Sequence, residues 1–305
     1  MTDWVSPADE SDIPRPQPVD RAPRPGPVAE RVDRGPALAP RTPTELIDHA
    51  FGFLRRHPRE VVTTSALFVV PFAVVVAYLQ RNVLGGESFI DAFSNSDPSL
   101  FADEQTANNS TLQVLSFIGP SIGLVYVAAA LAMMAAAERA GQVVDGSAAF
   151  LRALKLTPAL LVSWVLVHIV EVIGLGLFVV PGVFAIIAFT VVAPVIGVER
   201  LGPLASMKRS NQLTSRRRGP VLGVILLSFF VELVVANALT ALPSFIAAAI
   251  GFDIGWIVLG VGSAVVSLIT TPFVALVSVE LYLDLRVRTE ALDIEMRLPD
   301  LFDTA

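Results

Sequence analysis

The stretch ALLVSWVLVHIVEVIGLGLFVVPGVFAIIAFTVVAPVIGV, residues 159–198, decides the fold. An α-helix rises about 1.5 Å per residue, so about 20 apolar residues cross the roughly 30 Å hydrocarbon core of a bilayer. The stretch is therefore too long for one crossing and long enough for two. Pro181-Gly182 lies near its middle and supplies a reversal of chain direction. We expect a tight hairpin of two spanning helices, over residues 159–178 and 181–198.

The composition of the whole chain agrees with a membrane protein. Hydrophobic residues make up 53% of the 305 residues and charged residues 16%, with a mean hydropathy of +0.65. A soluble domain carries about 25% charged residues. Cysteine is absent, which excludes disulfides, thiolate nucleophiles and Cys-ligated metals. These numbers exclude an ordinary soluble enzyme.

The same length argument, applied along the chain, predicts an all-α membrane protein with six transmembrane helices in three hairpins. Each hairpin is expected to follow a cytoplasmic amphipathic helix. The first of these begins at Thr42-Pro43-Thr44-Glu45, which has the capping-box order, and we expect it to lie on the membrane surface. The predicted spans are 61–80, 112–137, 159–178, 181–198, 220–242 and 254–282.

Three regions follow from this division. Residues 1–43 hold ten of the 22 prolines and little apolar surface, so we predict a disordered, Pro-rich cytoplasmic tail over 1–41. The membrane domain is predicted over 42–296, and a short cytoplasmic tail over 297–305.

The positive charges predict the orientation. Of the 22 Lys and Arg residues, all but Arg81 fall in the two terminal segments and in the loops 138–158 and 199–219. The loop 81–111, on the opposite side, is acidic. Because cytoplasmic loops are enriched in Lys and Arg, both termini are predicted to be cytoplasmic. The net charge of −6 is therefore divided by the membrane and gives no indication of nucleic-acid binding.

The chain also repeats itself. The second span ends in Glu138-Arg139-Ala140-Gly141 and the fourth in Glu199-Arg200-Leu201-Gly202, while Glu280 holds the corresponding position in the sixth. Each of these returning spans contains a proline: Pro120, Pro194 and Pro272. We predict three units in parallel orientation, although chance similarity is the alternative. After the sixth span, charges of alternating sign at 284–290 predict an exposed or partner-docked helix end.

Three ionisable residues lie within the predicted spans: His168, Glu171 and Glu232. Such residues are costly in hydrocarbon and are candidates for function. They predict a polar centre inside the bundle, either a proton relay or cation site, or a structural hydrogen bond that fixes helix packing. Both interpretations remain open at the level of sequence.

The remaining motifs exclude more than they assign. No Gly-x-Ser-x-Gly, His-Glu-x-x-His or Walker pattern occurs, so no catalytic residue, metal site or cofactor is predicted. Basic residues before the fifth span could contact anionic lipid headgroups, or serve only as a topology signal. These residues are Lys208, Arg209, Arg216, Arg217 and Arg218.

Two further stretches carry a family resemblance. The first is Glu199 followed by Arg209-Ser210-Asn211-Gln212-Leu213, and the second is Leu281-Tyr-Leu-Asp-Leu-Arg-Val-Arg-Thr-Glu-Ala-Leu-Asp-Ile-Glu-Met296. Together with Val179-Val-Pro-Gly182 they resemble bacterial proteins named after the membrane domain of glycerophosphoryl diester phosphodiesterases, with Ala291 where glycine is usual. The resemblance covers residues 42–296. Family phosphodiesterases carry catalysis in a separate soluble domain, for which we expect no room after residue 296, so the resemblance implies architecture and no activity.

The sequence leads to one main functional hypothesis and two alternatives. The main one is a non-enzymatic scaffold or accessory protein of the bacterial plasma membrane, which engages membrane lipids or a partner protein through its cytoplasmic face. The first alternative is a small-molecule or lipid transporter built around Glu171 and Glu232. The second is a membrane-embedded lipid enzyme, with His168 as a base.

Overall fold

In a computed structural model, residues 41–80, 104–250 and 252–290 are described. The chain divides into two units, Met1–Arg34 and Gly35–Ala305, and everything below concerns the second. The predicted tail 297–305 and almost all of the predicted tail 1–41 lie outside the described residues. Arg41 is the exception. It is ordered and buried, so its assignment to a disordered tail is wrong for this residue.

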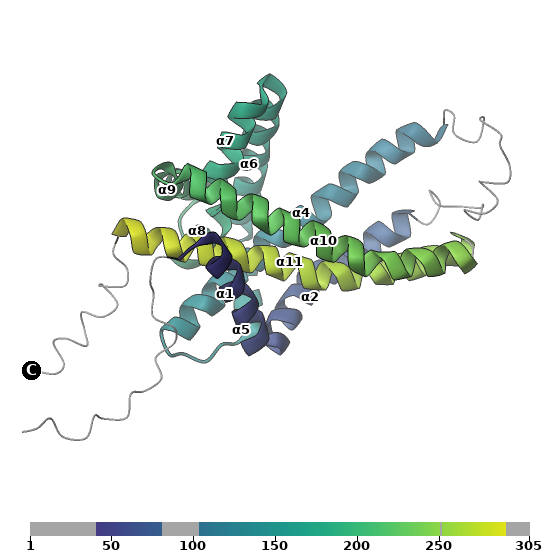
Figure 1. The fold of residues 1–305 in the computed structure, drawn as a ribbon, viewed down its shortest axis with the longest axis horizontal. Helices are drawn as coiled ribbons and strands as arrows, with labels where there is room; N and C mark the ends of the chain where they lie inside the picture. The colour runs from purple at the N-terminus through teal and green to yellow at the C-terminus, as the bar shows by residue number, and fades with distance from the viewer. Residues whose placement is uncertain (1–40, 81–103, 251, 291–305) are drawn as a thin grey trace, which may run out of the picture. The chain divides into compact units, whose positions relative to one another are not determined.

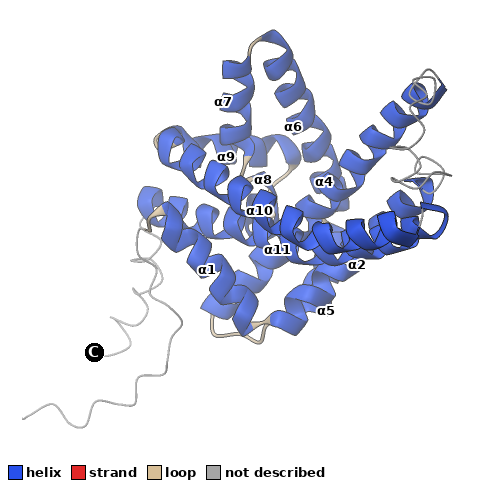
Figure 2. Ribbon diagram, turned by 45° about the vertical axis from the view of Figure 1, so that its right-hand side comes forward, coloured by secondary structure: helices blue, strands red, loops and turns tan. Residues whose placement is uncertain are grey.

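All regular structure in the described residues is helical, as Figures 1 and 2 show. Six helical stretches are long and apolar enough to cross a membrane, which confirms the prediction of an all-α protein with six candidate spans. The helices are α1 (Pro43–Arg56), α2 (Pro58–Gln80), α4 (Glu104–Arg139), α5 (Gly146–Lys155), α6 (Thr157–Leu177), α7 (Val179–Phe189), α8 (Val192–Glu199), α9 (Pro203–Ser215), α10 (Arg218–Ile250) and α11 (Phe252–Glu290).

The stretch 159–198 forms three helices rather than two. Helix α6 ends before Phe178, whose extended backbone makes the reversal ahead of Pro181. A Cβ on Gly174 would lie 3.0 Å from the Cα of Gly182, so these glycines permit the close approach of α6 and α7. The predicted fourth span is interrupted between α7 and α8. Pro194 explains the break, because it has no N–H for the Thr190 carbonyl and its ring clashes with that group.

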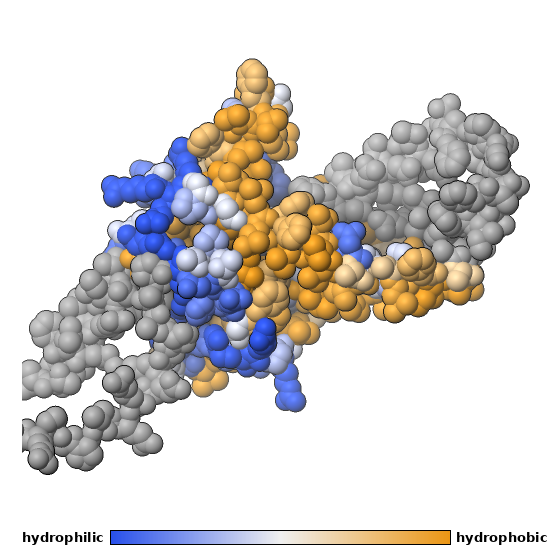
Figure 3. Space-filling view, in the orientation of Figure 1, coloured by the Kyte–Doolittle hydropathy of each residue, from blue (hydrophilic) through white to orange (hydrophobic). Residues whose placement is uncertain are grey.

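Hydrophilic residues gather on the side of the molecule where α1, α9 and the end of α11 lie (Figure 3). Over α7 and α10 the visible surface is hydrophobic. Phe178, just before α7, and Phe229 and Phe245 of α10 are large apolar side chains that are exposed. In water such a surface would be unfavourable, whereas lipid chains accept it. We call the hydrophilic side, formed by α1, α9 and the end of α11, the polar end. The rest of the described helices form an apolar part that is suited to span a membrane.

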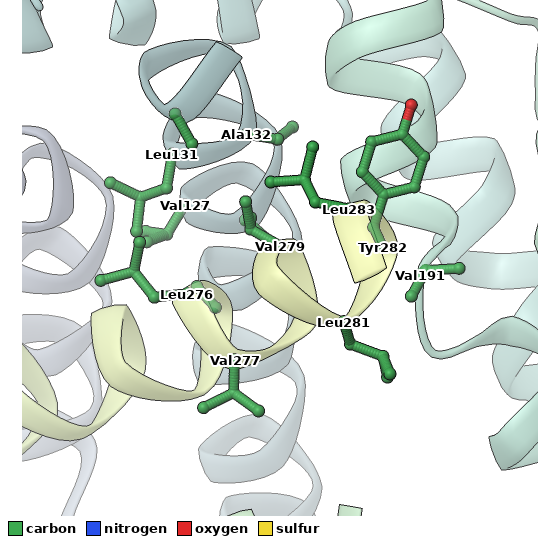
Figure 4. Close-up of a cluster of buried hydrophobic side chains, with 14 of the residues drawn as sticks. Val127, Leu131, Ala132, Val191, Leu276, Val277, Val279, Leu281, Tyr282 and Leu283 are labelled. Carbon is green, nitrogen blue, oxygen red and sulfur yellow. The ribbon is translucent and has the colours of Figure 1, made fainter. Parts of the chain in front are cut away.

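The core lies where α11 crosses α4. Leu276, Val279 and Leu283 of α11 pack with Val127 and Leu131 of α4, and all are buried (Figure 4). Tyr282 is also fully buried, and its hydroxyl group donates a hydrogen bond to Glu199 at the polar end. Close packing of this kind fixes where the last turns of α11 lie.

Helix α1 has its predicted capping box, because Thr42 and Glu45 each accept a hydrogen bond from the other's backbone N–H. Its apolar face is buried against α11 and α10, and the ring of Phe51 stacks on Phe273 with centroids 4.8 Å apart. This face is therefore covered by protein, and the location of α1 at the membrane surface stays a prediction.

Candidate functional site

His168 joins a short polar chain between α6 and α4. Its Nδ1 donates to the Trp164 carbonyl at 2.9 Å, and the two rings lie 4.5 Å apart. The indole Nε1 of Trp164 donates in turn to the Ser121 hydroxyl of α4 at 3.2 Å. Both residues line a cavity of about 160 Å³, together with Thr190, Ser278 and mostly apolar side chains. This arrangement can hold a small polar group between helices.

The two intramembrane carboxylates are not joined by any contact that the structure describes. Glu171 lies one helical turn from His168, which acts on it electrostatically. Within the described residues neither Glu171 nor Glu232 forms a hydrogen bond or an ion pair, and neither lines a described cavity. Helix α6 packs mainly on α7, and α10 mainly on α11. The predicted polar centre thus remains a prediction.

The polar end contains a buried ion cluster centred on Glu280, whose side chain is 2% exposed. Arg41 Nη1 donates to Oε2 of Glu280 at 2.6 Å. Arg139 Nη2 donates to Oε1 and Oε2 at 3.0 and 3.1 Å. One carboxylate therefore connects Arg41, two residues before α1, with the end of α4 and the last turns of α11.

One turn further along α11, Asp284 adds a second layer to this cluster. Its Oδ1 accepts the backbone N–H of Arg41 at 2.7 Å, and its Oδ2 accepts Arg288 Nε at 2.7 Å. Arg288 Nη2 also donates to the carbonyl of Arg41 at 2.7 Å. The backbone N–H, the carbonyl and the side chain of Arg41 are thus all bonded to α11.

A second cluster binds α8 and α9 to the end of α11. Glu199 accepts hydrogen bonds from Arg209 Nε at 2.9 Å and from the Tyr282 hydroxyl at 2.9 Å. Arg209 also pairs with Glu290, which accepts Arg286 Nε at 2.9 Å. Hydrogen bonds to Glu290 and Glu199 raise the pKa of Arg209 above the ordinary value for arginine, although burial opposes this shift. The guanidinium group of Arg209 therefore stays positively charged.

A third cluster lies between α1 and the end of α4. Glu138 accepts Arg56 Nε at 2.9 Å and lies 3.0 Å from His57 Nε2. Glu138, Glu199 and Glu280 hold the equivalent positions of the proposed repeat, and each has an arginine partner. The sequence singled out these glutamates but assigned them no role. Their arginine partners lie 10 to 239 residues away in the sequence. The sequence alone therefore shows the repeated glutamates but does not indicate which arginines pair with them.

His49 of α1 lies near the Glu280 cluster. Burial lowers the pKa of His49 below its ordinary value, and the cations Arg41 and Arg139 lower it further, while Glu280 opposes them. The imidazole is therefore held neutral beside an excess of buried guanidinium groups.

The five basic residues expected to contact lipid divide into two groups. Arg209 belongs to the second ion cluster. Lys208, Arg216, Arg217 and Arg218 are exposed and form no ion pair within the part of the chain that the structure describes. The Arg218 guanidinium lies 5.0 Å from the centroid of the Phe184 ring, so it spans from α10 to α7. Four cations therefore remain available at the polar end.

No group of His, Asp and Glu suited to hold a metal occurs within 41–80, 104–250 and 252–290. Comparison with protein-family models, curated proteins and solved structures finds no match to this chain. The resemblance to the phosphodiesterase membrane domain therefore stays a prediction.

Proposed function

We propose that the chain is a non-enzymatic accessory or scaffold protein of a bacterial plasma membrane, which engages anionic lipids or partner proteins through its cytoplasmic face. In this proposal the six spans form three hairpins, each after an amphipathic helix, with both termini in the cytoplasm. This arrangement is the one that the resemblance to the phosphodiesterase membrane domain implies.

The observation that carries the proposal is the division of charge at the polar end. Five carboxylates there, those of Glu138, Glu199, Glu280, Asp284 and Glu290, are held in internal ion pairs, whereas Lys208, Arg216, Arg217 and Arg218 remain exposed and unpaired among the described residues. Each such cation contributes about 1 kcal/mol of attraction near an anionic membrane surface. The internal pairs hold the helix ends in place, so the exposed cations are presented by a fixed surface.

The test is retention of anionic lipid by the purified full chain. A variant with Lys208→Ala, Arg216→Ala and Arg218→Ala is compared with the wild type in vesicle-derived nanodiscs of mixed phosphatidylglycerol and phosphatidylcholine. We expect enrichment of phosphatidylglycerol around the wild type and a clear reduction around the variant. Equal enrichment of both lipids around the wild type contradicts lipid engagement.

Transport is the alternative, and the polar chain from Ser121 through Trp164 to His168, beside a cavity, favours it. Reconstituted vesicles loaded with a pH-sensitive dye distinguish the two functions. Transport predicts a proton or solute flux that Glu171→Gln and Glu232→Gln reduce. A scaffold predicts no flux above empty vesicles.

A further inference from the structure

A cavity of about 230 Å³ opens at the polar end, where the start of α1 and the start of α10 meet the last turns of α11. Arg41, Arg217 and Arg288 line it, together with a single carboxylate, that of Asp284. Pro43 at the start of α1 and Pro220 in the first turn of α10 also line it. The three arginines favour an anion at this position.

The charges at this cavity do not balance. Asp284 is already bonded to Arg288 and to the backbone of Arg41, and Glu280 is shared by Arg41 and Arg139. Among the residues that line the cavity, three guanidinium groups, including that of the exposed Arg217, face one carboxylate. Arg217 forms no ion pair within the described residues, so an anion at this position would give it a partner and stabilise the cluster.

Hydrogen-bond donors are also in excess. The side chain of Arg41 is only 7% exposed, and its Nη2 has no hydrogen-bond partner among the described residues. Arg139 Nε, on the other side of Glu280, is likewise buried and unpartnered. Buried polar groups in proteins are almost always hydrogen-bonded, so the unpartnered Nη2 of Arg41, a residue that lines the cavity, indicates that an acceptor belongs there.

The remaining wall of the cavity is apolar. Leu46, Val221, Val224 and Leu281 line it, and the two valines lie in the first turns of the predicted fifth span. The cavity therefore extends from the polar end to the level where the hydrocarbon-facing surface begins. Guanidinium groups bind phosphate oxygens in paired geometry, and an apolar wall accommodates an acyl or glycerol segment.

We propose that this cavity binds a phosphate group, presented by an anionic phospholipid whose glycerol end lies against the apolar wall. The proposal rests on the proposed function, because it assigns one defined site to a protein that engages anionic lipids. In this site Arg217 is the exposed contact, whereas Arg41 and Arg288 are fixed in position by their ion pairs with Glu280 and Asp284.

The experiment titrates the full chain in an uncharged detergent with phosphatidylglycerol, phosphatidylcholine or inorganic phosphate, and follows the midpoint of thermal unfolding. We expect phosphatidylglycerol alone to raise the wild-type midpoint. Arg217→Ala removes a charge-assisted contact and should raise the half-saturating lipid concentration about tenfold. Arg217 is exposed, so this variant is expected to fold.

Arg152→Ala is the matched control, since Arg152 is an exposed arginine of α5 outside the cavity, and its half-saturating concentration should equal that of the wild type. If Arg216→Ala weakens binding as much as Arg217→Ala, the lipid is attracted by the basic surface in general, and the proposed site is wrong. An equal response to inorganic phosphate overturns the lipid as the source.

The failures are distinguishable. If phosphatidylglycerol stabilises the wild type and Arg217→Ala equally, the cavity is wrong but the proposed lipid engagement stands. If phosphatidylglycerol acts no better than phosphatidylcholine on any variant, both the cavity and the proposed engagement of anionic lipids fail.

Discussion

The polar end and the spanning helices differ in whether their carboxylates are paired with arginines. At the polar end Glu280 and Glu199 are held by arginines from distant segments, at 2.6 and 2.9 Å. Within the spans Glu171 and Glu232 have no hydrogen bond among the described residues. A carboxylate paired with arginines from distant segments links helices together, whereas an unpaired one provides no such link. The difference indicates that charge in this molecule serves assembly at one end.

The strongest way to break this comparison is Glu280→Gln. The substitution leaves Arg41 and Arg139 buried without their carboxylate, and loss of one partner of a buried pair costs about 3 kcal/mol or more. We expect the free energy of unfolding, measured by denaturant titration in mixed micelles, to fall by this amount. Glu232→Gln is the control and should change it little. Equal losses in the two variants would contradict the division into paired and unpaired carboxylates.

Gly197→Ala tests how closely the helices at the polar end are packed. A Cβ at Gly197 would lie 2.5 Å from the Ala129 carbonyl of α4, so α8 must move away. Overpacking of this kind costs about 1–3 kcal/mol. Gly223→Ala, where nothing lies within 4 Å, should leave the thermal midpoint unchanged or slightly raised, since alanine is the better helix former. A tolerated Gly197→Ala would show that α8 is not fixed against α4.

Tyr282→Phe sharpens the comparison within the second cluster. The variant keeps the buried ring and removes the hydroxyl that donates to Glu199 at 2.9 Å and accepts from Arg286 at 3.3 Å. We expect a loss of about 1 kcal/mol in the free energy of unfolding. Because Arg209 still holds Glu199, a loss as large as that for Glu280→Gln would indicate that the two clusters form one unit.

The smallest expected effect is a pH dependence from His49. The pKa of His49 is lowered in the folded chain by burial and by Arg41, so the unfolded chain takes up the proton first as the pH falls through about 6.5. Stability should therefore decrease below about pH 6.5 until the folded state also binds the proton.

His49→Gln should remove this part of the slope. The measurement is the difference in thermal midpoint between wild type and variant from pH 8 to pH 5, because other groups then cancel. A difference that stays constant with pH would contradict a neutral His49 beside Arg41, Arg139 and Glu280.

The spans were predictable from sequence because the bilayer imposes a length on every crossing. The ends of the spans were less predictable. Helix α11 continues to Glu290, beyond the predicted end at residue 282, and the helix break near Pro194 divides a stretch that hydropathy alone predicts as one span. The helix end at 284–290, expected to be exposed or docked on a partner, is instead bonded to this chain's own Arg41 and Arg209.

The ion clusters were not predictable as contacts. Arg41 and Glu280 lie 239 positions apart, and no periodicity in the sequence links them. Hydrophobic patterns report which face of one helix is buried, but not which distant residue completes a pair. The intramembrane residues stood out by their cost in hydrocarbon, whereas the polar-end residues resemble ordinary cytoplasmic charges until α11 brings them together.

The attachment of Arg41 to α11 also sets an order of events during synthesis. Helix α1 leaves the ribosome first, yet its polar anchors, Glu280 and Asp284, and much of its apolar partner surface lie on the last span. Contacts between chain ends form late because the intervening chain must first be made and arranged. Helix α1, the first of the described helices, therefore completes its docking only after α11 has entered the membrane.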